Sequence, residues 1–426
     1  MSKDGKFDFL FVLGGVPMGH ASGGNVIVYE LARRLTRDGY QVGLFYLSDV
    51  NDILKQYLSK DGSATIVNGA SLTRYIRLIL PFLPLKDYGG PKSNSLAGAL
   101  DLAAGNITMN TFNSRIGYYL LLPFLRKLLK IGFGYDMRNL RGVRILFGRE
   151  FDKSLVSERV VVQGFPVALH LSSHRTDPKT YYLIQAFEDD PAVSGNLYRL
   201  AAKSLELPLK KIVVNKELYK AYLKDRPLFF TPGFDSNFFR VLRPIERRDP
   251  KSVLVQLMKG KMKGASYGID AMEYLKKDLS DVTIRAFGNL ERSMIPHHIE
   301  FHLLPSKSEL QRLYNMSSVF VSPSVREGFG LPVLEAMHSG CAVVTFDNGG
   351  VNEYLRDNFN GIIVRTIDSN SLKNAIAGLI QDSPKRLVIA RNGYQTSAAY
   401  SYGRMYHQFA QAIKNYESNL AVPYDR

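Results

Sequence analysis

The sequence predicts an α/β protein made of two doubly wound domains, each with a mostly parallel sheet covered by helices on both faces. Short aliphatic and β-branched runs alternate with amphipathic helical patterns along both halves of the chain. A stretch with four prolines, residues 225–250, interrupts this alternation. The chain has 426 residues, 45% of them hydrophobic and 22% charged, which suits two soluble domains of ordinary size.

The first domain opens with a strand, a glycine-rich loop, a helix and a second strand. The strand is FDFLFVLGGV, and the loop PMGHASGGN separates it from the helical pattern VIVYELARRLTRDGY. Val26 and Leu35 lie on the apolar face of this helix, and Gly39 supplies its stop. The strand QVGLFYL follows, so the whole segment is a βαβ unit.

The second domain begins after the proline-rich stretch with VLVQL, a lysine-rich loop, a helix near YGIDAMEYLKKDL and the strand VTIRAFG. Further units follow through VFVSPS, LPVLEAMHSG, CAVVTFD and NGIIV. We therefore predict one domain over residues 1–230 and another over 245–395. A helical stretch over 396–420 comes too late to join the second sheet, and we assign it to the first domain.

The charge of the chain predicts an anionic partner. Half of the net charge of +16 lies in residues 71–150, where twelve lysines or arginines face four acidic residues. Aliphatic runs such as GYYLLLPFLRKLLKIGFG interrupt these charges, a pattern typical of a bilayer surface and not of a nucleic-acid site. A core helix flanked by solvated lysines is the alternative. Arg126 and Lys127 cut the run before it reaches the roughly 20 apolar residues of a spanning helix.

The single cysteine, Cys341, leaves no intrachain disulfide framework. The start MSKDGKFDFLFVLGG passes directly into a strand-like run without a signal-type cleavage site. We therefore expect a cytoplasmic location, with a peripheral position on the inner face of the membrane if the basic segment binds lipid.

Two glycine-containing loops are candidate ligand sites, because ligands of doubly wound sheets bind beyond the carboxyl ends of the strands. GHASGGNV places Gly23 and Gly24 at the start of a helix, where a ligand can approach backbone N–H groups, although such a loop is as often only a turn. KGKMKGAS places Lys259, Lys261 and Lys263 after the first strand of the second domain. Three cations there suit a diphosphate better than a merely solvated loop.

The third candidate is REGFGLPVLEAM, in which seven residues separate Glu327 from Glu335. Pro332 marks the start of a helix, so Glu327 falls in the loop after a strand and Glu335 falls about one turn inside the helix. Two carboxylates beside a Gly-Phe-Gly turn can accept hydrogen bonds from vicinal hydroxyls. The alternative is a surface glutamate followed by one that interacts with the helix dipole.

These residues resemble a known family. SPSVREGFGLPVLEAMHSGCAVVTFDNGGVNEYL, followed by NGIIV, closely resembles the donor-site signature of the retaining glycosyltransferases of family four. The KMKG loop resembles the Lys-Gly loop of that family, TPGFDSNFF its interdomain turn, and GGNVIVYELARRL its first helix. The likeness covers most of residues 8–415, thinly between 50 and 160. YYLIQAFE also resembles segments of bacterial rhamnosyltransferases of the same family, which suggests a deoxysugar donor.

The resemblance implies two Rossmann-like domains that face a cleft, with the acceptor bound by the first and a nucleotide sugar by the second. A hexose or deoxyhexose would pass with retention to an acceptor hydroxyl, in glycan, polysaccharide or glycolipid synthesis. By position, Glu335 would bind the ribose hydroxyls, Glu327 the transferred sugar and Lys263 the diphosphate. The other donor-side residues would be Gly328, Phe329, Gly330, Leu331, Lys259, Lys261, Gly23 and Gly24.

The sequence departs from the family pattern in two places. An arginine usually stands five residues before the loop lysine, and here Met258 occupies that place, so Lys259 or Lys261 must supply the second charge. A histidine often ends the strand that matches TYYLIQAFEDD, and here the strand offers Gln185 and Glu188. His170 and His174 are nearby in sequence and are further acceptor-side candidates.

No metal and no cofactor are expected besides the nucleotide sugar, and the acidic run over 188–190 is interpreted as a solvated turn. The main alternative is a nucleotide-cofactor oxidoreductase, since Asp49 stands where a dinucleotide ribose partner would. The G-x-G-x-x-G spacing is missing from GGVPMGHASGG, however. A sugar-binding protein that has lost activity on the same fold is the third hypothesis.

Overall fold

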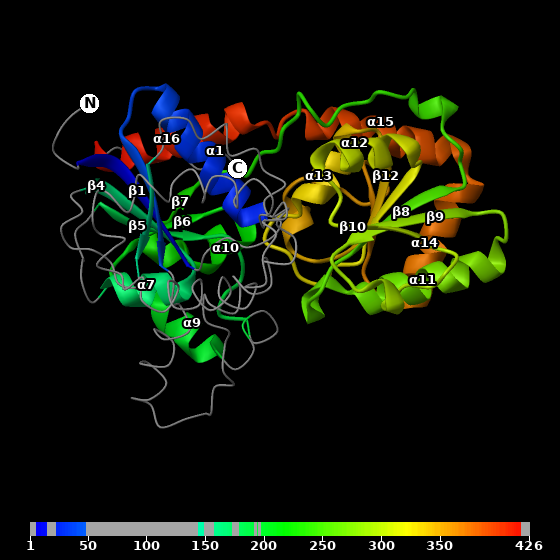
Figure 1. Cartoon of the computed structure of the whole chain (residues 1–426), viewed down its shortest axis with the longest axis horizontal. Coiled ribbons are helices and arrows are strands. Elements are labelled where there is room, and N and C mark those ends of the chain that lie inside the picture. The colour runs from blue at the N-terminus through cyan, green and yellow to red at the C-terminus, as the bar shows by residue number, and fades with distance from the viewer. Residues whose placement is uncertain are drawn as a thin grey trace, which may run out of the picture.

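The computed structural model describes residues 6–14, 23–47, 144–148, 157–172, 179–190, 194 and 197–418. Its first domain is built on a seven-stranded sheet in the order β3-β2-β1-β4-β5-β6-β7 (Figure 1). The strands are β1 (Phe7–Gly14), β2 (Val42–Leu47), β3 (Arg144–Gly148), β4 (Ser157–Gln163), β5 (Thr180–Ile184), β6 (Lys210–Val213) and β7 (Leu228–Phe229).

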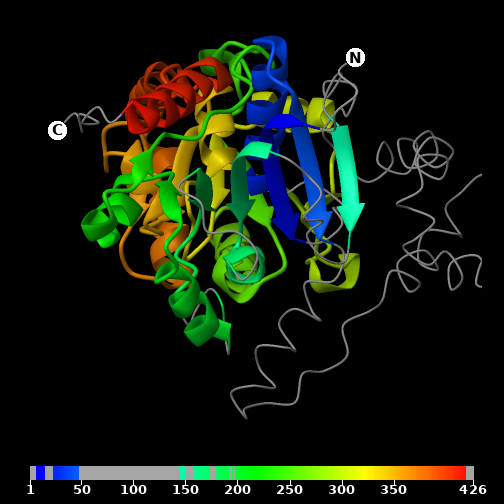
Figure 2. The ribbon, with the colours of Figure 1, turned by 90° about the vertical axis from the view of Figure 1, so that its left-hand side faces the viewer.

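Helices cover both faces of this first sheet. Helix α1 packs beside α16 on one face, and α7 packs beside α9 on the other, whereas the short α10 follows β6 at the boundary with the second domain (Figures 1 and 2). Their bounds are α1 (Gly23–Arg37), α7 (Phe165–Ser172), α9 (Tyr198–Leu205), α10 (Lys216–Ala221) and α16 (Tyr402–Glu417).

The second domain is built on a six-stranded sheet in the order β10-β9-β8-β11-β12-β13. Figure 1 shows α12, α13 and α15 on one face and α11 and α14 on the other. The strands are β8 (Ser252–Leu257), β9 (Thr283–Gly288), β10 (Glu300–Leu303), β11 (Val319–Ser322), β12 (Ala342–Phe346) and β13 (Ile362–Val364). The helices are α11 (Ala265–Asp278), α12 (Lys307–Met316), α13 (Leu331–His338), α14 (Ser369–Gln381) and α15 (Ser383–Ser397).

The predicted fold class is confirmed, because every strand pair that the structure describes in either sheet is parallel. Within each domain the order of the first six strands follows the doubly wound pattern in which the chain reverses direction beside the first strand. The central strands are apolar on both faces, as Leu10, Phe11 and Val12 in β1 show, because helices bury both sides.

Helix α16 belongs to the core of the first domain although it ends the described chain. Phe409 packs against Phe9, Phe11 and Phe230 of that domain. At the far end of the helix, Glu417 accepts two hydrogen bonds of 2.7 Å from the Arg159 guanidinium. The aromatic contacts and this bidentate pair attach the helix along its length.

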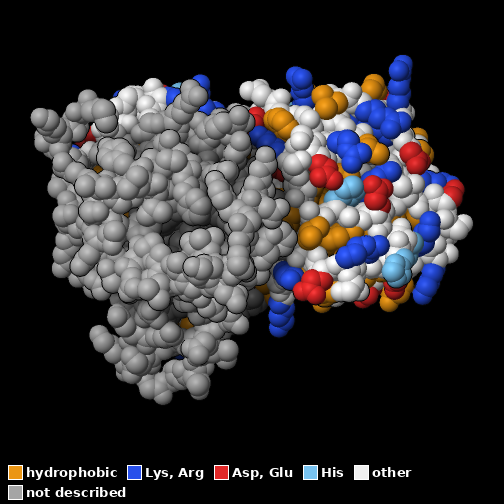
Figure 3. Space-filling view, in the orientation of Figure 1, with side chains coloured by type: hydrophobic (Ala, Val, Ile, Leu, Met, Phe, Trp, Pro, Cys, Tyr) orange, Lys and Arg blue, Asp and Glu red, His pale blue; other side chains and the backbone are white. Residues whose placement is uncertain are grey.

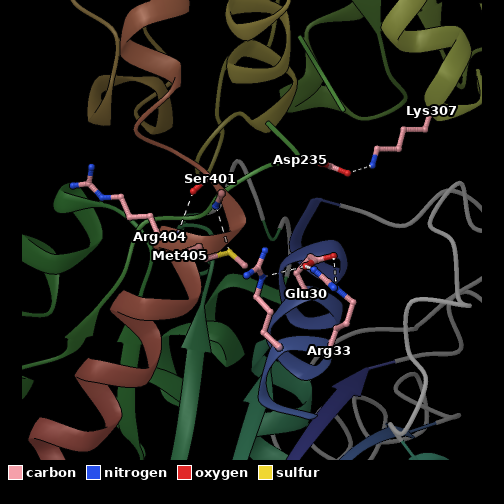
Figure 4. Close-up of polar contacts among 9 residues, drawn as sticks. Glu30, Arg33, Asp235, Lys307, Ser401, Arg404 and Met405 are labelled. Atoms are coloured by element: carbon pink, nitrogen blue, oxygen red, sulfur yellow. Dashed lines mark hydrogen bonds and ion pairs between the residues drawn. The ribbon is translucent and has the colours of Figure 1, made fainter. Parts of the chain in front are cut away.

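The chain crosses between the domains twice, and the two crossings are bonded to each other. Phe234 pairs with Ser401, with backbone hydrogen bonds from Phe234 N to Tyr400 O at 3.1 Å and from Tyr402 N to Phe234 O at 3.2 Å. A Cβ on Gly233 would lie 2.4 Å from the Ser401 carbonyl oxygen, so only glycine allows this approach. Figure 4 shows Ser401 at the start of α16, close to Arg404 and Met405 of that helix.

Much of the basic segment over 71–150, including its predicted membrane-binding runs, lies outside the described residues. Among the residues that the structure does describe, no helix is both long enough and apolar enough to cross a membrane. On the face in Figure 3, the described surface of the second domain intersperses basic, acidic and hydrophobic side chains.

Candidate functional site

The lysine-rich loop after β8 is pressed against the segment that follows β11. Gly264 adopts a φ of +61°, and a Cβ there would lie 1.9 Å from the Pro323 carbonyl oxygen, so the position requires glycine. The Val325 N–H donates to the Met262 carbonyl oxygen at 2.8 Å. The two predicted loops of the second domain therefore form one surface at the carboxyl ends of its strands.

Lys263 and Glu327 meet on this surface. Lys263 Nζ lies 2.7 Å from Glu327 Oε1, and the two side chains are 39% and 18% exposed. The Glu327 backbone N–H donates to the Asn348 carbonyl oxygen at 3.0 Å, which fixes the glutamate beside the loop after β12. Lys259 points away from Glu327, with its Nζ 3.4 Å from Glu291 Oε1, and Lys261 is exposed. The structure thus brings one of the three predicted lysines to the glutamate.

The Gly-Phe-Gly turn leads directly into α13. Gly330 is the N-cap with a φ of +87°, and Pro332 stands in the first turn, where its missing N–H costs nothing. The Tyr354 hydroxyl donates to the Gly330 carbonyl oxygen at 2.8 Å, and this hydrogen bond stabilises the turn. The free N–H groups at the start of α13 point toward this turn and carry partial positive charge.

Glu335 lies deeper on α13, with part of its side chain still exposed. The Tyr314 hydroxyl donates to Glu335 Oε2 at 3.2 Å. Burial raises the pKa of Glu335 to about 8, opposed by the Tyr314 hydrogen bond and the charge of Lys307, and supported by the charge of Asp235. Lys307 Nζ is 2.5 Å from Asp235 Oδ2, and Figure 4 shows the two side chains directed at each other.

The first domain reaches this surface through Gln185, directly after β5. Gln185 Nε2 donates to the Gly24 carbonyl oxygen in the first turn of α1 at 3.3 Å. On the other side, a Cβ on Gly328 would lie 1.7 Å from the Gln185 carbonyl oxygen. The structure therefore brings together three predicted residues, Gly24, Gln185 and Gly328, from separate parts of the chain.

The structure describes two of the three other acceptor-side candidates, Glu188 and His170. The Tyr182 hydroxyl donates to Glu188 Oε2, and burial raises the pKa of Glu188 to about 7. His170 is buried on α7 within the first domain. His174 lies outside the described residues, as does Asp49, the residue on which the oxidoreductase alternative depends.

The acidic run after β5 has three separate sets of contacts. Glu188 bonds Tyr182, Asp189 accepts from the Tyr222 hydroxyl at 3.2 Å, and Asp190 Oδ2 lies 3.4 Å from Arg326 Nε of the second domain. The run is therefore partly a domain contact and not only a solvated turn.

Two polar residues beside the Gln185 contact were not predicted. Gln163 ends β4, next to β5, and its buried Oε1 has no hydrogen-bond partner within the described part of the chain. Asn215, after β6, donates from Nδ2 to the Gly328 carbonyl oxygen at 2.6 Å. A polar residue directly after an apolar strand, as in VVVQ and KIVVN, is the sequence signal that identifies both positions.

A family model covers the second domain. Residues 245–396 match the family described as glycosyl transferases group 1. This range contains the Lys263 loop, the Gly-Phe-Gly turn and all of α13.

Curated relatives each match part of the chain. An N,N'-diacetylbacillosaminyl-diphospho-undecaprenol alpha-1,3-N-acetylgalactosaminyltransferase of Campylobacter jejuni is 33% identical over 99 residues, 23% of this chain and 26% of that protein. A poly(glycerol-phosphate) alpha-glucosyltransferase of Bacillus subtilis is 25% identical over 277 residues, 59% of this chain and 40% of that protein. The chain covers only about a quarter of the Campylobacter relative and less than half of the Bacillus one.

Solved structures match the whole fold. The sucrose-phosphate synthase of Thermosynechococcus elongatus has a TM-score of 0.61 at 14% identity, covering 97% of this chain and 100% of that chain. Anabaena HepE in complex with UDP and glucose has a TM-score of 0.62 at 14% identity, covering 96% and 99%. At this identity the likeness establishes the fold, two Rossmann-like domains. The comparisons do not favour the oxidoreductase alternative.

Proposed function

We propose that this chain is a retaining glycosyltransferase. It transfers a hexose or deoxyhexose from a nucleotide-diphosphate sugar to an acceptor hydroxyl in glycan, polysaccharide or glycolipid synthesis. The observation that carries the proposal is the contact between Lys263 and Glu327 at the carboxyl ends of β8 and β11, beside the start of α13. A cation, a carboxylate and free helix N–H groups are the groups that a sugar diphosphate requires.

The expected donor contacts follow from the placement of these groups. Lys263 is partly exposed, so its ammonium can bind a diphosphate while it remains beside Glu327. The backbone N–H groups of residues 328–331 suit phosphate and sugar oxygens. Glu327 would accept hydrogen bonds from the transferred sugar, and Glu335 would accept them from the ribose. The HepE complex, which holds UDP and glucose on a similar fold, supports a nucleotide-sugar donor.

Transfer with retention needs no separate base in this scheme. The bond between the anomeric carbon and the diphosphate oxygen breaks, and the acceptor oxygen bonds to that carbon on the same face. The acceptor proton passes to the departing diphosphate oxygen. Lys263 and the start of α13 stabilise the charge that develops there, so the proposal includes no metal and no cofactor.

The acceptor is proposed to be a glycan or a lipid-linked glycan. The name of the Campylobacter relative specifies a diphospho-undecaprenol substrate, and that of the Bacillus relative specifies poly(glycerol-phosphate). The basic, apolar segment over 71–150 supports a peripheral position on an anionic membrane surface. Such a position would be on the cytoplasmic face, where nucleotide sugars are substrates.

Donor turnover tests the proposed function. The protein is incubated with UDP-, GDP-, ADP- and dTDP-sugars. NMR follows the release of the nucleotide and the anomeric configuration of the sugar product when it first forms. Release from one donor, with the product keeping the donor's anomeric configuration, is the expected result. Inversion would overturn retention. Binding of a nucleotide sugar without any turnover across glycan and lipid-linked acceptors would instead support the sugar-binding alternative.

A further inference from the structure

The N-terminus of α10 is bonded to both domains. Asn215, its N-cap, is 1% exposed, and its Oδ1 accepts the Leu218 N–H at 2.7 Å. The same side chain donates from Nδ2 to the Gly328 carbonyl oxygen in the second domain at 2.6 Å. Asn215 therefore caps a helix of one domain and binds the Gly-Phe-Gly turn of the other.

The next two residues of α10 also contact the second domain. The Lys216 N–H, one of the groups that a helix leaves unpaired, donates to Glu353 Oε2 at 2.9 Å. Asn352 Nδ2 donates to Glu217 Oε1 at 3.2 Å. Both partners belong to one short segment after β12, so three consecutive first-domain residues bind the donor side of the second domain.

Gly328 has no freedom to move toward the first domain in this arrangement. Its Cα lies so near Gln185 that a Cβ would stand 1.7 Å from the Gln185 carbonyl oxygen. The carbonyl oxygen of Gly328 itself accepts the hydrogen bond from Asn215 Nδ2. The preceding residue is Glu327, whose carboxylate binds Lys263. The Asn215 hydrogen bond therefore acts one residue away from the proposed sugar-binding carboxylate.

We propose that Asn215 is a positioning residue, which fixes the Gly328 turn against the first domain and so sets the geometry of the donor site when the domains are together. The predicted effect of Asn215 on donor use rests on the proposed function. The predicted effect of Asn215 on the Gly328 turn is independent of that function, because the hydrogen bond between them is present without a ligand.

Asn215→Asp separates the two roles of this side chain. An aspartate keeps the oxygen that caps α10 but has no N–H for the Gly328 carbonyl oxygen. The matched control is Asp368→Asn, since Asp368 caps α14 at the Ser371 N–H with a distance of 2.8 Å and lies outside this contact. Asn215→Ser, which also keeps a capping oxygen, is the second variant should the aspartate destabilise the domain contact by charge.

Hydrogen exchange of the full chain, read by mass spectrometry over residues 326–331, tests the structural part. We expect exchange there to become about two- to tenfold faster in Asn215→Asp and Asn215→Ser, the effect of one lost hydrogen bond. The control should match the wild type. Unchanged exchange over 326–331 in both Asn215 variants would overturn the inference.

Steady-state kinetics test the link to the donor. With the donor that the wild type turns over, the Asn215 variants should raise KM or lower kcat by a similar factor at unchanged Tm. A variant with faster exchange and unchanged kinetics would overturn the positioning role. A wild type that turns over no nucleotide sugar would instead remove the proposed function, and the exchange result would still decide the role of Asn215 in the domain contact.

Discussion

Lys263 Nζ lies 2.7 Å from Glu327 Oε1, which joins the loop after β8 to the loop after β11. Both side chains stay partly exposed to solvent, so the ion pair contributes little to the stability of the fold. A lysine and a glutamate that face each other at the ligand edge of a sheet form a site with both a cation and a hydrogen-bond acceptor.

Replacing Lys263 should impair activity without unfolding the protein. Under the proposed function, Lys263→Ala is expected to lower kcat about 10²- to 10³-fold, because it removes a charge that would stabilise the leaving diphosphate. The free energy of unfolding should change by no more than about 1 kcal/mol, as for other partly exposed ion pairs. Lys251→Ala, which breaks an exposed pair with Asp281, is the control and should change neither quantity. An unaltered kcat in Lys263→Ala would remove the lysine from the site.

Glu335 should make stability depend on pH in a defined window. Its pKa rises from 4.5 to about 8 in the folded protein, so between these values the folded state keeps a proton that the unfolded state has released. Its stabilising contribution is full below about pH 4.5 and falls by about 1.4 kcal/mol per pH unit as the pH rises toward 8. Glu335→Gln should remove this dependence.

Urea denaturation from pH 5 to 8.5 measures this effect as the difference between variant and wild type. Glu291→Gln, which replaces a side chain 73% exposed, is the control and should follow the wild type. A difference between Glu335→Gln and wild type that stays constant across the window would contradict the raised pKa.

A methyl group at Gly328 should separate the domains at the proposed site. Gly328→Ala places a Cβ 1.7 Å from a backbone oxygen, which no side-chain movement relieves. Displacing the turn by about 1 Å should lower the transfer rate about 100-fold. Gly378→Ala on α14 is the matched control, because its Cβ would meet nothing within 4 Å. That variant should be about 0.5–1 kcal/mol more stable and fully active. Equal rates for the two variants would exclude the Gly328 contact.

Among the residues of the proline-rich stretch 225–250, Arg248 should contribute most to the free energy of unfolding. Its buried guanidinium donates to the carbonyl oxygens of Ser317 and Ser339, which end α12 and α13, and to Arg243 O in the linker itself. Arg248→Met leaves these oxygens unpaired and should cost about 3 kcal/mol or more. Arg391→Ala, which breaks an exposed pair with Glu246, should cost less than about 1 kcal/mol. Urea denaturation decides between these values, and equal costs would be evidence against the role of Arg248.

The fold was predictable because the sheets are buried on both faces. Strand segments such as residues 10–13 and 319–321 are continuous apolar runs, and Gly39 and Pro332 mark helix boundaries by local chemistry. The placement of Gly23 and Gly24 at the start of a helix is confirmed, whereas the helical pattern written as VIVYELARRLTRDGY was less exact, since α1 spans Gly23–Arg37.

The contacts between domains could not be read in the same way. Asn215 and Gly328 are 113 residues apart, and Gln185 and Gly24 are 161 apart, so no local pattern connects them. The lysine loop is a related case. Its three lysines are close in sequence, but the short helical turn over 261–263 makes their side chains point in different directions. Lys259 therefore pairs with Glu291, whereas Lys263 pairs with Glu327.

The central claim is that the Glu327–Glu335 segment holds a nucleotide sugar, and calorimetric titration tests it most directly. Uridine, guanosine, adenosine and thymidine diphosphates and their sugars are titrated into wild type and Glu335→Ala. We predict that the wild type binds one nucleotide selectively and that the variant binds it about tenfold or more weakly, because a hydrogen bond from the ribose to the Glu335 carboxyl group is lost. Equal binding by both proteins, or binding of a dinucleotide alone, would contradict the account.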